Sequence, residues 1–166
     1  MVRIKQAISR LRRRSSQRGQ GMVEFALVLP VLILLLIGIM EFGYFFFVYS
    51  SANTAVREAV RYGSASGDSA AGVAYYKDCA GIREVATRIG RYANIQNGDI
   101  TINYDDGPGT ASLGACSSAY DPALGERIIV QVDVTYHPII TLLNLPDIDI
   151  HAESARTIIK RVQVGG

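Results

Sequence analysis

A long uncharged apolar run near the N-terminus constrains this chain more than any other feature. Residues 25–40 are sixteen consecutive residues without a charge, and after Glu41 the apolar character resumes over residues 42–49. The hydrocarbon core of a bilayer is about 30 Å thick, so a helix needs roughly 20 apolar residues to cross it. Residues 23–48 meet that length, and the sequence therefore predicts one membrane-spanning helix.

The charges on the two sides of this run are strongly asymmetric. Residues 1–18 contain seven basic residues and no acid, whereas the rest of the chain has ten basic residues and fifteen acids. Basic residues next to a membrane span stay on the cytoplasmic side. The sequence therefore predicts a single-pass protein of the cytoplasmic (inner) membrane, with its N-terminus in the cytoplasm. A nucleic-acid role for the basic block is the competing interpretation, and nothing else in the chain supports it.

The N-terminal region also differs from an ordinary secretory signal peptide. Such peptides have an apolar region of only 7–15 residues that ends at a small-residue cleavage site. Here the apolar run is longer, and Gly19 and Gly21 lie before it. We therefore expect the apolar segment to remain in the mature protein.

The helix is expected to continue beyond the membrane surface, because residues 50–62 are rich in alanine. Ala55, Ala59 and Gly63 follow one another at i, i+4 and i+8. Small residues at this spacing allow another helix to approach closely. The alternative is that alanine is simply a good helix former, and the sequence leaves both open. The composition of residues 63–72 indicates a flexible linker.

The remainder of the chain has the pattern of a small α+β domain. An apolar stripe at helical spacing predicts a helix over residues 79–93. Alternating residues predict strands at 100–104, 128–136 and, more weakly, 148–162. Residues 105–125 are expected to form a long loop. The expected fold is a membrane-anchored α+β protein, in which one helix of the outer domain lies on an antiparallel sheet. Its parts are a basic leader (1–19), a transmembrane and juxtamembrane helix (20–64), a linker (65–78) and an extracytoplasmic domain (79–166).

The two cysteines, Cys79 and Cys116, both lie on the predicted outer side of the membrane. An even pair in an oxidising compartment most simply indicates one disulfide. The alternative is two free buried thiols, because sequence alone does not show that the two sulfurs meet.

The most specific motif lies just before the apolar run. Gly19 is followed by four residues, Gln20 to Val23, and then by Glu24 and Phe25. This pattern resembles the processing site of Flp-type pilins and of the TadE-like pseudopilins that accompany them. The resemblance continues through Pro30 and through Glu41 to about Gly63.

The resemblance implies a processing step and a set of partners. A membrane-embedded prepilin peptidase would cut after Gly19, and Gln20 would become the new N-terminus. Glu24 would then lie one helical turn from the new amine and could pair with it or with a neighbour's amine, because a buried carboxylate needs such a partner. The alternative is that Glu24 caps the helix start. The implied partners are other pilins or pseudopilins, the inner-membrane assembly platform and the peptidase.

Two further residues of the apolar run stand out. Glu41 is an ionisable residue within the predicted span, which points to a functional role. It is either a contact with another subunit or a hydrated glutamate in the outer leaflet, near the aromatic residues of positions 42–49. Pro30 lacks an amide proton and should weaken or kink the helix, which would help a pilin helix leave the bilayer.

Signals for catalysis or metal binding are poor. His137 and His151 are far apart in the sequence, and solvated or core histidines are favoured over a metal pair. Residues 105–109 are acidic but lack the ligand spacing of a calcium loop, so a turn is favoured. No serine or cysteine lies in a nucleophile motif. The sequence therefore predicts a protein that is not an enzyme and needs no cofactor or metal.

The leading hypothesis from sequence is a minor pilin or pseudopilin of a Tad-type (Flp, type IVc) pilus system, which acts by assembly. The runner-up is an uncut TadE-like anchor whose outer domain binds a protein partner or the cell wall. A membrane-tethered enzyme is the third hypothesis, and the missing catalytic constellation disfavours it.

Overall fold

The computed structural model describes residues 2–117, 119–140 and 145–160, and for residues 2–18 it describes the backbone alone. The helix α1 (Val2–Gly63) opens the chain and runs through Pro30. The chain forms two compact units, Met1–Gly43 and Tyr44–Gly166. The second unit, called the outer domain below, therefore begins within α1.

The first unit consists of α1 alone. Helical residues from Gly19 onward include a window of mean hydropathy 2.8 that is not buried at all. Apolar side chains such as Phe25, Leu34 and Met40 are at least half exposed. By length and composition this helix is compatible with a single membrane-spanning anchor.

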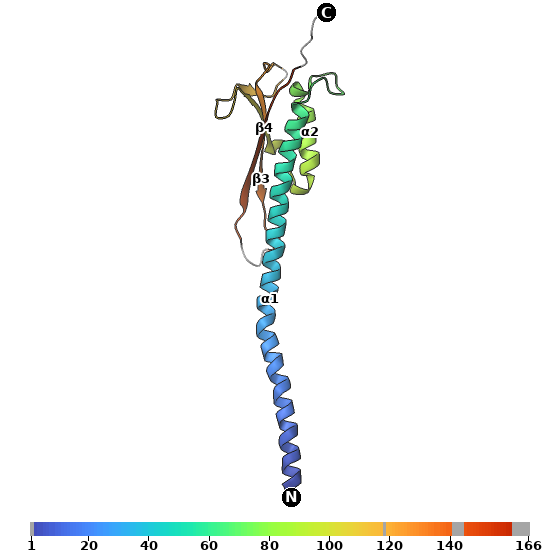
Figure 1. Cartoon of the computed structure of the whole chain (residues 1–166), viewed down its shortest axis with the longest axis vertical. Coiled ribbons are helices and arrows are strands. Elements are labelled where there is room, and N and C mark those ends of the chain that lie inside the picture. Colours follow the sequence, from blue (N-terminus) through green and yellow to red (C-terminus); the bar gives the residue numbers. More distant parts are fainter. Residues whose placement is uncertain (1, 118, 141–144, 161–166) are drawn as a thin grey trace, which may run out of the picture. The chain divides into compact units, whose positions relative to one another are not determined.

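The outer domain is built on one antiparallel sheet of four strands (Figure 1). The strands are β1 (Ile100–Asp105), β2 (Gly114–Ala115), β3 (Arg127–Tyr136) and β4 (Ile148–Thr157). Their order across the sheet is β2-β1-β3-β4. In the centre of the sheet Val132 lies between Ile100 on β1 and Ala152 on β4.

Two helical segments cover one face of this sheet and build the core. Residues 48–63 of α1 present a buried stripe at helical spacing, and α2 (Cys79–Ile89) adds Ile82 and Ala86. The inner side chains of the strands, including Ile102, Val130 and Val132, are at most 2% exposed. Single 3-10 turns join these elements: η1 (Tyr75–Lys77), η2 (Gly90–Ala93) and η3 (Asn97–Asp99).

Strand β3 runs antiparallel to residues 44–63 of α1. At one end, a Cβ added to Gly63 would lie 2.6 Å from Cδ1 of Ile128. At the other end, the ring of Tyr136 lies 5.5 Å from that of Tyr44 and 5.3 Å from that of Phe45. The helix rises about 28 Å over these residues, and the strand spans about 26 Å between its two contacts. The lengths match, so strand and helix stay in contact along the domain.

These elements confirm the predicted α+β fold and refine its parts. The predicted helix 79–93 is α2 followed by η2, and the predicted strands 100–104 and 128–136 are β1 and β3. The strand expected over 148–162 ends at Thr157, and residues 161 and 162 lie outside the described residues. The predicted loop 105–125 contains the short strand β2.

The segment expected to be a flexible linker is held by specific contacts. Ser69 N–H donates to the carbonyl of Val73 at 2.7 Å, and Asp68 and Ala74 form a β-bridge. The segment ends at Asp78, whose carboxylate caps α2 by accepting from the amide of Gly81 and also accepts from the Tyr62 hydroxyl. Backbone and cap hydrogen bonds therefore connect the end of α1 to the start of α2.

A buried ion pair on the sheet gives a stability prediction. Asp105 on β1 is 3% exposed, and the Arg127 guanidinium donates to both of its carboxylate oxygens. These hydrogen bonds hold the pKa of Asp105 below its usual range. A depressed carboxyl pKa stabilises the fold above the unfolded value of about 3.9, and this contribution is lost as the pH falls through the folded pKa.

We therefore expect Asp105→Asn to lower the free energy of unfolding at pH 7 by about 2–3 kcal/mol. The difference from the unmodified chain should shrink below about pH 4, where the unmodified carboxylate also becomes protonated. Denaturant unfolding of the full-length protein in detergent at several pH values measures both effects. The matched control is Asp133→Asn, because the Asp133 side chain is 66% exposed. A pH-independent difference for Asp105→Asn would contradict this account.

Candidate processing and assembly site

The predicted processing motif lies on the surface of α1. Gly19, Gln20, Glu24 and Phe25 are all helical and exposed in the structure. Gln20 and Glu24 are four positions apart, which places them one above the other on the same helix face. A new amine at Gln20 would therefore lie within one helical turn of the Glu24 carboxylate.

The glycines of this segment have no packing role in the folded chain. A Cβ added to Gly19 or Gly21 would meet nothing within 4 Å, and the same holds for Gly38 and Gly43. Gly63 is different, because its added Cβ would clash with side chains of Ile128 and Ile82. The fold itself therefore explains glycine at position 63 and gives no reason for glycine at position 19.

The structure also constrains the alternative interpretation of Glu24 as a helix cap. In the uncut chain α1 begins at Val2, so Glu24 lies well inside the helix and not in its first turn. The macrodipole acts mainly on the first and last turns. Glu24 would lie in a first turn only if the chain were cut after Gly19.

Glu41 is the second ionisable residue of the apolar run. Its side chain is 6% exposed, whereas the neighbouring Met40 and Phe42 are 67% and 71% exposed. Glu41 therefore lies on a different face of α1 from these two exposed neighbours. Both sequence-based interpretations of Glu41 stay predictions.

The small-residue face of α1 lies inside the outer domain. Ala55 and Ala59 are fully buried, and Gly63 contacts the sheet and α2 as described above. In the folded domain this face is covered by the chain's own core. The structure thus places these three residues in domain packing, and their role in helix–helix assembly stays a prediction.

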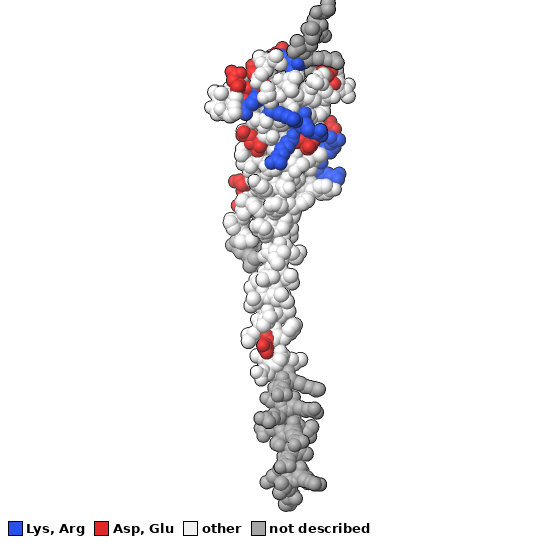
Figure 2. Space-filling view, in the orientation of Figure 1, with Lys and Arg blue, Asp and Glu red and all other residues white. Residues whose placement is uncertain are grey.

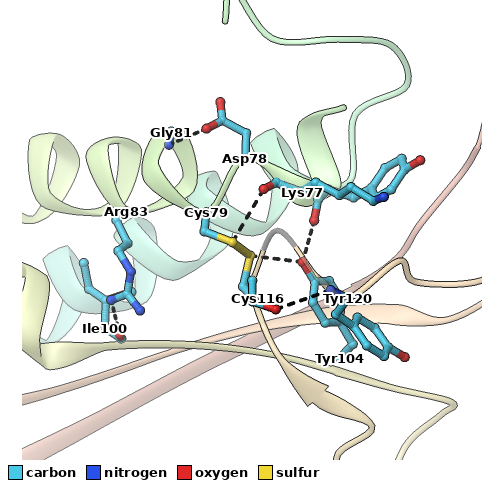
Figure 3. Close-up of a disulfide and its surroundings, with 11 residues drawn as sticks. Lys77, Asp78, Cys79, Gly81, Arg83, Ile100, Tyr104, Cys116 and Tyr120 are labelled. Carbon is cyan, nitrogen blue, oxygen red and sulfur yellow. Dashed lines mark hydrogen bonds between the residues drawn. A yellow bond between two sulfur atoms is a disulfide. The ribbon is translucent and has the colours of Figure 1, made fainter. Parts of the chain in front are cut away.

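The disulfide anticipated from sequence is present between Cys79 and Cys116, whose Cα atoms are 5.8 Å apart (Figure 3). It connects the first residue of α2 to the residue that follows β2. Tyr104 lies beside it, and its hydroxyl donates to the carbonyl of Tyr76 and lies 3.1 Å from Sγ of Cys116. Burial raises the pKa of Tyr104, so its hydroxyl stays protonated and remains a donor.

On the face shown in Figure 2, the charged side chains of the described residues gather on the outer domain, while the apolar run is almost free of them. His137 and His151 contact different aspartates. His137 lies 2.9 Å from Asp147, just beyond the ends of β3 and β4, and His151 on β4 lies 2.7 Å from Asp133 on β3. Among the described residues, no group of three or more His, Cys, Asp or Glu could hold a metal ion. Asp105, in the acidic segment 105–109, forms an ion pair with Arg127.

One feature of the outer domain was missed in the sequence. The connection between β3 and β4 carries exposed aliphatic residues, among them Ile139 and Leu145. The signal available in the sequence is the absence of any charge between His137 and Asp147.

Comparison with known proteins gives one match. A family model described as TadE-like protein matches residues 19–61. No curated protein is significantly similar to the chain, and neither is any solved structure. The match begins at the glycine of the processing motif and ends within the part of α1 that enters the outer domain. Residues 19–61 of this chain are therefore similar to TadE-like proteins, as the Gly19–Glu24–Phe25 motif predicts.

Proposed function

We propose that this chain is a minor pilin or pseudopilin of a Tad-type (Flp, type IVc) pilus system. The observation that carries the proposal is the TadE-like segment, residues 19–61, which joins the processing motif to the apolar helix. The family supports a role related to the Tad pilus. The chain would act by assembly: the N-terminal helix packs among other pilin helices, and the outer domain caps, primes or regulates the filament.

In this proposal the prepilin peptidase removes residues 1–19 and leaves Gln20 as the N-terminus. Support comes from Gly19, which nothing in the fold requires to be glycine. A glycine at the scissile position places no side chain in the way of an enzyme that binds the backbone. The mature chain would remain in the cytoplasmic membrane through α1 until it is assembled, with the outer domain on the extracytoplasmic side.

Pro30 and Glu41 are further residues of the proposed assembly helix. Because proline lacks the amide proton, the carbonyl one turn before it has no helical donor. This local weakness would make it easier for the helix to adjust when it leaves the bilayer. Glu41 is an ionisable residue within the apolar run, which supports a role in a contact with another subunit.

The alternative is an uncut anchor whose outer domain binds a protein partner or the cell wall. One observation favours it: α1 runs without a break through Gly19 and Gln20, whereas a peptidase needs an extended backbone. Processing would therefore require local unwinding of α1. The N-terminal residue of the mature protein separates the two proposals.

A Glu24→Gln variant tests the assembly role. If Glu24 pairs with the N-terminal amine of a mature chain inside a helix bundle, loss of the carboxylate charge leaves that amine without a partner. A buried charge without a partner costs about 3–5 kcal/mol, which should abolish incorporation into pili. Membrane insertion should survive, because residues 25–40 are unchanged. Piliation and co-purification with other pilus subunits are measured, together with the N-terminal residue by mass spectrometry, which should be Gln20.

The matched control is Glu84→Gln, which makes the same chemical change at an exposed site on α2. It should leave piliation and processing intact. Normal piliation of the Glu24→Gln strain would reject the pairing role. An intact leader in cells with an active peptidase would favour the uncut anchor.

A further inference from the structure

The end of the β3–β4 hairpin exposes aliphatic side chains. Ile139, Leu145 and Ile148 are 64%, 47% and 43% exposed, and we call these three residues the hairpin tip. Inner-face residues further along the hairpin are buried, with Val134 at 9% and Ile150 at 4%. Single exposed aliphatic residues are common on protein surfaces, but a cluster at one end of a domain marks a binding surface.

The hairpin tip lies at the end of the outer domain where α1 enters it. Tyr136, the last residue of β3, packs against Tyr44 and Phe45, and these are the first two residues of the domain. The opposite end of β3 lies at Gly63. The chain beyond Tyr136 therefore leaves the domain at the end that is covalently joined to the apolar run.

Exposed aromatic residues lie within one helical turn of these contacts. Phe46, Phe47 and Tyr49 on α1 are 59%, 48% and 45% exposed. Aromatic side chains gather where a membrane meets water, because their rings suit the headgroup region. This end of the domain thus combines exposed aromatic rings on the helix with exposed aliphatic groups on the hairpin.

A polar pair lies within the hairpin tip, between Ile139 and Leu145 on one side and Ile148 on the other. His137 and Asp147 face each other at 2.9 Å and are 71% and 60% exposed. Thr135 donates to Asp149 at 2.8 Å two residue pairs further along the strands, beyond the pair of Tyr136 and Ile148. Exposed polar side chains therefore lie close to the exposed aliphatic ones, as expected of a segment that enters an interface only to a shallow depth.

From these contacts we propose that the hairpin tip partitions into the outer interface of the lipid bilayer that α1 crosses. The proposal rests on the proposed membrane anchor. The occupant is lipid acyl chain and not an anionic headgroup, because the neighbouring outer face of the hairpin carries Asp133, Asp149 and Glu153. The tip would hold the outer domain close to the membrane surface as a second contact beside α1.

The chain contains no tryptophan, so a single introduced indole reports on one position. The full-length Ile139→Trp variant is reconstituted into phosphatidylcholine vesicles with brominated acyl chains, which quench indoles that reach them. The emission should shift to the blue and lose most of its intensity. The matched control is Leu124→Trp, at a residue equally exposed (63%) but in the loop that precedes the other end of β3; its emission should be unchanged.

A Leu34→Trp variant, within the apolar run, separates failure of this inference from failure of the anchor. Quenching at position 34 without quenching at 139 would overturn the inference and leave the anchor intact. Absence of quenching at both positions would overturn the anchor and the inference together. If indole 139 becomes shielded only after other pilus subunits are added, the tip binds protein and the lipid proposal is overturned.

A double variant controls for the lipid affinity of the introduced indole itself. Leu145→Ser in the Ile139→Trp background removes an aliphatic group of the tip, and we expect weaker quenching. Unchanged quenching would show that the indole alone enters the lipid and would overturn the proposal. Adding anionic lipid should not strengthen quenching in any variant.

Discussion

Val132→Asp is expected to unfold the outer domain. Val132 lies in the middle of β3 between Ile100 and Ala152, and its side chain is fully buried. The substitution loses about 1.5–3 kcal/mol of apolar burial and adds the cost of a carboxylate without a partner, which is several kcal/mol. Because domains are stable by only about 5–15 kcal/mol, this sum is enough to remove most of the folded population.

The adjacent residue provides the control. Asp133 is exposed and faces His151 on the outer side of the sheet. Asp133→Asn should change the free energy of unfolding by no more than about 0.5 kcal/mol, as is usual for exposed positions. Limited proteolysis and circular dichroism of the two full-length variants in detergent compare them directly. If the domain tolerated both substitutions equally, the assignment of Val132 to the buried face of β3 and of Asp133 to its exposed face would be wrong.

This pair of residues also shows why the sheet could be predicted from sequence. In β3 buried side chains alternate with partly or fully exposed ones over ten residues, so the period of two in the sequence specifies which face packs. The same holds for α2, where Asp78 caps the helix and Ile82 and Ala86 lie on its buried face. A repeated pattern with one buried face is therefore sufficient to locate these elements.

Other elements carry no such signal. Strand β2 has only two residues, Gly114 and Ala115, and is defined by backbone pairing with Asn103 and Tyr104, which leaves no side-chain pattern. Ala55 and Ala59 look the same in sequence whether they face another subunit or their own sheet. Only the three-dimensional position of β3 shows that α1 belongs to the domain core.

The functional features of the chain likewise include some that the sequence predicts and some that it does not. The resemblance to TadE-like proteins could be predicted from Gly19, Glu24 and Phe25 because their spacing is specific, and the family match over residues 19–61 confirms the resemblance. Processing at Gly19 stays a prediction. The hairpin tip was missed because its aliphatic residues have no period of their own. Their significance depends on Tyr136 lying beside Tyr44 and Phe45, a long-range contact that the sequence does not contain.

Removal of the Cys79–Cys116 disulfide is the other change with a large expected effect. The bond closes a segment with a sequence separation of 37 residues. For a loop of this length the chain-entropy estimate is about 4 kcal/mol of stabilisation. A Cys79→Ser/Cys116→Ser double variant should lower the melting temperature of the outer domain by on the order of 15 °C.

Loss of structure in the double variant should begin at one edge of the sheet. β2 pairs with β1 at only two positions, and β3 and β4 pair over ten, so β2 depends most on the covalent link. The stack of Tyr104 on Tyr120, with centroids 5.0 Å apart, lies next to the bond. Hydrogen exchange of the double variant should therefore accelerate first at residues 104–116, while the amides shared by β3 and β4 stay protected.

The double serine variant avoids the free thiol that a single substitution would leave. A suitable control is the unmodified protein treated with a reductant, which should reproduce the same exchange pattern, because both samples lack only the covalent link. Uniform loss of protection across β3 and β4 at low temperature would contradict a local role. It would instead mean that the disulfide holds the whole domain together, since an edge defect alone does not expose the amides at the centre of the sheet.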